Sequence, residues 1–74
     1  MDATAKQELA RAIRKTHEIR EASYTGNYRY SMSYTEAAAQ ACDDPDIAAL
    51  VAAMLGSGFS DFPSWSNSIL DKQA

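Results

Sequence analysis

The sequence contains only one cysteine and one histidine in 74 residues. Because Cys42 has no second cysteine to pair with, an intramolecular disulfide is excluded, and with it the disulfide-rich scaffold of many small secreted proteins. No lysine near the N-terminus is followed by an apolar run, and the longest uncharged stretch, 47–60, is too short to span a bilayer. We therefore expect a cytoplasmic protein that does not bind membranes.

The sequence also lacks a recognisable catalytic or metal-binding arrangement. Catalysis needs a nucleophile, a base or a metal beside an orienting partner. The sequence places no base near Cys42, and His17, four residues before Glu21, is expected to be a structural or solvated side chain. The acidic run 43–46 resembles the start of a calcium loop, but Ala48 and Met54 occupy the positions where that loop needs glycine and glutamate. We expect these aspartates to cap a helix, and we expect no enzymatic activity, cofactor or metal.

Positive charge is scarce after the first half of the chain. Residues 1–34 carry six basic and four acidic side chains, whereas residues 35–74 carry one basic and six acidic side chains, so the halves have net charges of +2 and −5. This balance argues against nucleic acid as a partner. Two alternatives remain: nucleic-acid binding through the basic residues of the first helix, and a mobile-element inhibitor whose acidic half imitates nucleic acid.

Length and composition predict one small globular domain over residues 1–74. A chain of this size buries only about 60% of the surface that its unfolded form exposes, but 46% of its residues are hydrophobic, as in folded proteins. The predicted fold is α-rich, with three to four short helices and a short β-hairpin at about 23–34. An all-α fold is the alternative.

The first predicted helix spans about Ala5 to Glu21. A capping-box pattern at 4–7 precedes it, and a spacing of three and four residues defines its apolar face. That face comprises Ala5, Leu9, Ala12, Ile13, Thr16 and Ile19.

Capping patterns indicate two further helices and composition suggests a fourth. Ser33 and Glu36 form a capping box before an alanine-rich segment, and Asp44 is placed to cap a helix that runs from Pro45 to about Leu55. Gly56 is expected to end that helix in the left-handed conformation. A last short helix is predicted from Phe62 or Pro63 to Asp71.

The segment between the first two helices contains all four tyrosines. The Gly26-Asn27 pair predicts a tight turn, and alternation after it would place Tyr28, Tyr30, Met32 and Tyr34 on one face of a hairpin. Tyrosine provides a large contact area with few rotatable bonds. We therefore predict that Tyr24, Tyr28, Arg29 and Tyr30 bind a partner. In the alternative interpretation, which can hold at the same time, at least two of Tyr28, Tyr30 and Tyr34 are core residues.

The helix predicted at 45–55 has no polar side from Ile47 onward. Ile47, Leu50, Val51, Met54 and Leu55 form an apolar stripe, and alanines cover the remainder. Such a helix is usually enclosed by neighbours, but this short chain offers few. We expect Ala49 and Ala53 to contact another protein or a second copy of the chain; alternatively, the alanines tolerate water.

Together these features predict a small, non-enzymatic protein-binding module, such as an adaptor, a regulatory subunit or an inhibitor. It would act through the apolar helix and the tyrosine-rich segment.

Overall fold

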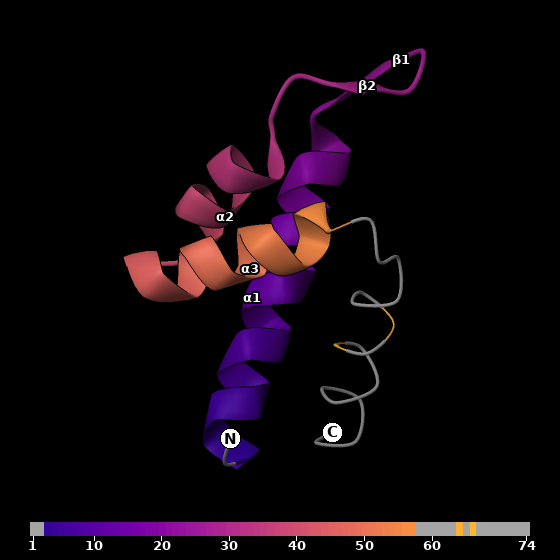
Figure 1. The fold of residues 1–74 in the computed structure, drawn as a ribbon. Coiled ribbons are helices and arrows are strands. Elements are labelled where there is room, and N and C mark those ends of the chain that lie inside the picture. Colours follow the sequence, from indigo (N-terminus) through magenta and orange to yellow (C-terminus); the bar gives the residue numbers. More distant parts are fainter. Residues whose placement is uncertain (1–2, 58–63, 65, 67–74) are drawn as a thin grey trace.

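A computed structural model describes residues 3–57 together with Ser64 and Ser66. Its elements, in chain order, are α1 (Ala3–Ala22), β1 (Tyr24–Gly26), β2 (Arg29–Tyr30), α2 (Tyr34–Ala41) and α3 (Pro45–Gly56) (Figure 1). The α-rich fold with a short hairpin is thus confirmed. Ser64 and Ser66 are helical, but the rest of the helix predicted from Phe62 or Pro63 to Asp71 lies outside the described residues.

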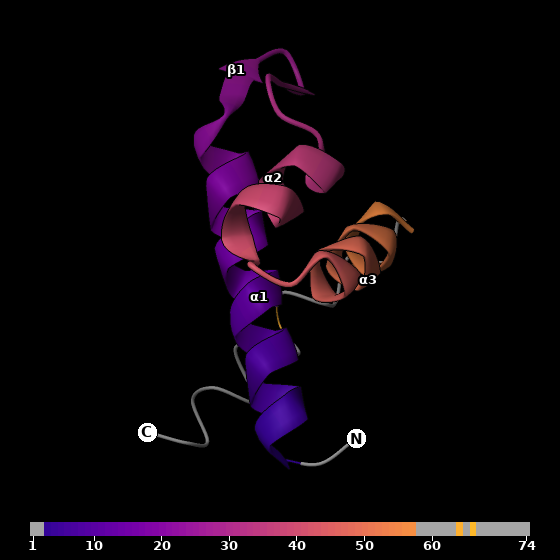
Figure 2. The same cartoon turned by 90° about the vertical axis from the view of Figure 1, so that its left-hand side faces the viewer.

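The helices α2 and α3 pack against one side of α1, and α3 crosses α1 near its middle (Figures 1 and 2). The core where they meet consists of Leu9 and Ile13 from α1, Ala38 from α2, and Val51 and Leu55 from α3. Ile13 and Val51 are fully buried. Burial of these side chains is the main favourable contribution to folding, worth about 2 kcal/mol for each large aliphatic group.

The predicted apolar face of α1 is largely confirmed, but the predicted start of the helix is wrong. Leu9, Ile13 and Thr16 are buried, whereas Ala10, outside the predicted face, is buried as well. Thr4 lies inside α1, which spans Ala3–Ala22. A threonine within a helical turn cannot serve as its cap, because the cap residue needs a non-helical backbone.

The predicted starts of α2 and α3 are confirmed by their hydrogen bonds. Ser33 Oγ accepts the N–H of Glu36 at 3.1 Å, and Asp44 Oδ1 accepts the N–H of Asp46 at 2.8 Å. Pro45 occupies the first turn of α3, where its missing N–H costs nothing. Each cap is worth about 1 kcal/mol.

The predicted left-handed stop at Gly56 is wrong. Gly56 belongs to the helix, and Ser57 ends α3 in a right-handed conformation. The Ser57 N–H and hydroxyl both donate to the carbonyl of Met54, at 3.4 and 2.8 Å. Because these bonds satisfy a terminal carbonyl of the helix, a left-handed glycine is not needed.

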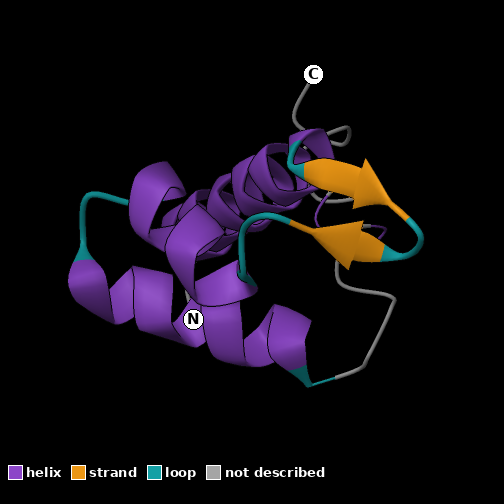
Figure 3. Ribbon diagram, turned by 90° about the horizontal axis from the view of Figure 1, so that it is seen from above, coloured by secondary structure: helices purple, strands orange, loops and turns teal. Residues whose placement is uncertain are grey.

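The hairpin of β1 and β2 lies at the C-terminal end of α1, beyond the layer formed by α2 and α3 (Figures 1 and 3). Of the helices that the structure describes, none is both long and apolar enough to cross a membrane.

Candidate functional site

The tip of the hairpin is a two-residue turn made by Asn27 and Tyr28. The strands pair Tyr24 with Tyr30 and Gly26 with Arg29, and both turn residues have positive φ, 54° for Asn27 and 60° for Tyr28. Two positive φ angles in a two-residue hairpin define the mirror-image turn whose twist matches that of the strands. The hairpin is confirmed, but its turn lies one residue later than the predicted Gly26-Asn27.

Gly26 is displaced from the turn into an irregularity of the strand, with φ of 95°. The pairing of Tyr24 with Tyr30 fixes the register, so the glycine falls before the turn. The predicted alternation over 28–34 also fails, because β2 ends at Tyr30, Ser33 caps α2 and Tyr34 is already helical.

Tyr28 projects from the turn with 94% of its surface exposed. Its backbone N–H donates to the hydroxyl of Tyr24 at 3.2 Å, but its ring is almost fully exposed to solvent. A left-handed conformation suits asparagine, whereas a bulky side chain adopts it only at a cost of about 1 to 3 kcal/mol. The hairpin therefore holds an aromatic ring in water at a position that glycine would occupy with less strain.

A stacked arrangement at the base of the hairpin fixes it to α1. The Arg20 guanidinium lies 3.9 Å from the ring centroids of both Tyr30 and Tyr34. The rings of Tyr24 and Tyr30 are in turn 5.2 Å apart and inclined by 56°. Cation–π contacts of this kind contribute about 0.5 to 2 kcal/mol each. The base of the hairpin is thus a small aromatic cluster built around one arginine.

Polar bonds complete this attachment. The Tyr30 hydroxyl donates to Glu21 Oε1 at 3.4 Å, and partial desolvation together with the Glu21 charge raises the pKa of Tyr30 above its ordinary value. Ser23 Oγ donates to the Arg20 carbonyl at 2.6 Å, and the Ser31 N–H donates to the Ser23 carbonyl at 2.9 Å. These bonds tie both ends of the hairpin to the last turn of α1.

The predicted tyrosine site therefore divides into two parts. Tyr24, 49% exposed, and the exposed Tyr28 and Arg29 are available for contact. Tyr30 is half-buried against Arg20, and Tyr34 packs against the core. The alternative core interpretation thus holds for Tyr34 and fails for Tyr28. Sequence reasoning missed Arg20, because its ring partners lie ten or more residues away and no local pattern links them.

The outer face of α3 is apolar, as predicted. Ala49 and Ala53 are exposed, and Leu50, a member of the apolar stripe, is 47% exposed. The stripe is covered only in part because α3 packs on one side, where Val51 and Leu55 are buried. The structure does not bring this face together with the hairpin, which lies at the far end of α1 (Figures 1 and 2).

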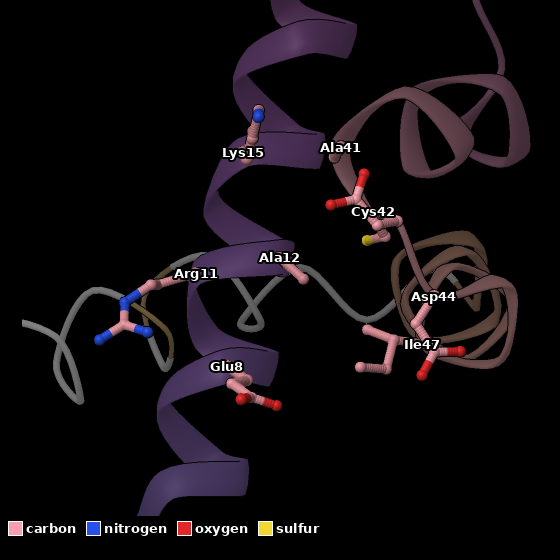
Figure 4. Close-up of a pocket in the computed structure, with 9 residues that line it drawn as sticks. Glu8, Arg11, Ala12, Lys15, Ala41, Cys42, Asp44 and Ile47 are labelled. Atoms are coloured by element: carbon pink, nitrogen blue, oxygen red, sulfur yellow. The ribbon is translucent and has the colours of Figure 1, made fainter.

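A cleft of about 450 Å³ separates α1 from the connection between α2 and α3. Figure 4 shows the Cys42 thiol directed toward α1, with Lys15 above it and Arg11 turned away. Burial raises the pKa of the Cys42 thiol, although the Thr16 hydroxyl and the Lys15 charge act in the opposite direction.

Cys42 is expected to react slowly with a thiol reagent at pH 8 in the folded protein and rapidly after denaturation. The raised pKa keeps the folded thiol protonated, and the thiolate is the reactive form. The same shift makes the folded state bind its proton more tightly, so stability should fall as the pH rises above about 9. Equal labelling rates in 0 and 6 M guanidinium chloride, measured with Ellman's reagent, would contradict a structural thiol.

Within the described part of the chain, no three His, Cys, Asp or Glu side chains are grouped so that they could hold a metal ion. The chain matches no protein-family model, and no curated protein and no solved structure is significantly similar to it, so its own residues must indicate its function.

Proposed function

We propose that this protein is a small, non-enzymatic protein-binding module that contacts its partner through the tip of the hairpin. One observation carries the proposal: Tyr28 is 94% exposed and has a left-handed backbone. A conformation that costs stability persists where the rest of the structure enforces it, and such positions cluster at functional sites. The ring contributes nothing to the core, so contact with another molecule is the role that its position supports.

The neighbours of Tyr28 suit a protein interface. Tyr24 and Arg29 are exposed beside it, and tyrosine and arginine are the residue types, with tryptophan, that most often dominate binding energy. The hairpin is held on α1 through Arg20, so the backbone at the tip is already ordered and loses little conformational entropy on binding. The apolar face of α3 provides a second surface for contact.

Quantitative affinity capture from the source organism tests this proposal. The wild-type protein and the Tyr28→Gly variant would be immobilised separately, and the retained proteins compared by mass spectrometry. We expect at least one protein to be enriched tenfold or more on the wild type, because losing a central aromatic contact costs about 2 kcal/mol of binding.

Gln40→Ala provides the matched control, since Gln40 is exposed on α2, away from the hairpin. It should retain the same protein as the wild type. Identical retention by the wild type and by Tyr28→Gly would contradict a contact role for the ring. Retention of nucleic acid that is lost steeply with added salt would indicate the nucleic-acid alternative instead.

A further inference from the structure

The outer face of α3 has no polar side chain between Ile47 and Leu55. Its exposed positions in that range are Ala49, Leu50 and Ala53. Ala49 and Ala53 are small, so another helix could approach beside Leu50 to an interaxial distance within the usual 8 to 10 Å. Twelve residues of α3 give a face about 18 Å long, which matches a partner helix of about three turns.

A hollow lies on each side of this face. The larger, about 370 Å³, separates α3 from α2 and has Ala39, Pro45, Ala48 and Ala49 among its lining residues. The smaller, about 130 Å³, lies toward α1 beside Ile47 and Leu50. The face thus forms a ridge with a groove on each side, and the side-chain ridges of a second helix can pack into such grooves.

The segment that carries this face and the neighbouring groove has charge of one sign. Residues 30–57 contain no lysine, arginine or histidine, but they contain four carboxylates, all exposed: Glu36, Asp43, Asp44 and Asp46. Asp43 lines the larger hollow itself. Arg11 and Lys15 of α1 line the neighbouring cleft, together with Asp43 and Asp44. A partner that covers the face would therefore meet an apolar surface with an acidic rim.

We infer that the outer face of α3, with the groove between α2 and α3, binds a basic amphipathic helix of another protein. The apolar stripe of that helix would lie on Ala49, Leu50 and Ala53. Its lysines or arginines would face Asp46, one turn before Ala49 and Leu50 on α3, and Asp43 in the groove. Charge complementarity of this kind selects partners and speeds their association. The inference rests on the proposed protein-binding function and names the chemistry of a partner.

The same charges disfavour a second copy of the chain as the occupant. A two-fold dimer would bring identical faces together. Because residues 30–57 contain no basic side chain, neither α3 face would offer a cation to the carboxylates of the other.

Labelled synthetic peptides of about 18 residues, long enough to form a helix on binding, test the inference by fluorescence anisotropy. One peptide carries leucine at helical spacing with lysine elsewhere; the control has the same leucines with glutamate in place of lysine. The wild-type protein should bind the lysine peptide at least tenfold more tightly. Ala49→Lys and Ala53→Lys should each weaken that binding at least tenfold, whereas Gln40→Lys, which adds the same charge on α2 outside the groove, should change it less than about twofold.

Circular dichroism and sedimentation complete the test. Equal weakening by all three lysine variants would mean that only net charge matters, and it would overturn the inference. Unfolding of both α3 variants would identify the face as core. If the wild type forms dimers and these variants dissociate them, the occupant is a second copy of the chain. Either result would overturn the inference. Absence of peptide binding would also overturn it, while capture that depends on Tyr28 would leave the proposed function standing.

Discussion

Ile13→Ala is expected to leave the protein largely unfolded at 37 °C. Ile13 is fully buried where α1 meets α2 and α3, and truncation of a buried isoleucine to alanine costs about 2 to 5 kcal/mol. Small domains have a free energy of unfolding near the low end of the usual range, about 5 kcal/mol. Truncation of this one side chain would therefore remove most of the free energy of unfolding.

Ile19→Ala provides a matched control on the same helix, since Ile19 is only half-buried. Urea denaturation followed by circular dichroism should show that Ile13→Ala costs at least about 1 kcal/mol more than Ile19→Ala. Equal losses in the two variants would mean that the core does not centre on Ile13.

Arg20→Ala is expected to release the hairpin while the helices stay folded. Its guanidinium lies 3.9 Å from the centroids of two tyrosine rings, so the variant loses both contacts, about 1 to 4 kcal/mol together. An isolated two-stranded hairpin is marginal in water. Without this support, the tip should lose its fixed geometry and partner capture should weaken together with it.

Hydrogen exchange measured by NMR locates this effect. The Ser31 amide, which donates to the Ser23 carbonyl, should lose its protection in Arg20→Ala, whereas amides of α1 around Ile13 keep theirs. Arg11→Ala, a change at an exposed position of the same helix, should leave the Ser31 amide protected. Unchanged protection in Arg20→Ala would contradict the role of this stack.

The helices could be predicted from the sequence because their signals are local. Helical spacing identified Leu9 and Ile13, and the caps at Ser33 and Asp44 are set by residues two or three positions apart. The exposure of Leu50 could not be predicted, because it depends on how many neighbours α3 has. A periodic pattern records which residues share a side, but tertiary packing decides which side is covered.

The hairpin shows the same division between local and long-range information. Glycine and asparagine in sequence predicted a turn, but the exact pair depends on strand register. That register is set by Tyr24 and Tyr30, and Tyr30 is held by Arg20, ten residues earlier. Tyr28 is exposed and Tyr34 packs on the core, and this difference could therefore be learned only from the structure.

The free energy of unfolding of Tyr28→Gly tests most directly the central claim that the fold gives up stability to present this ring. Glycine keeps the backbone N–H that donates to the Tyr24 hydroxyl and adopts positive φ without strain. We predict that urea denaturation will show Tyr28→Gly to be as stable as the wild type or more stable, by up to about 1 kcal/mol. A loss of more than about 1 kcal/mol would contradict the claim, because Tyr28 would then serve the fold and the basis for a contact role would be gone.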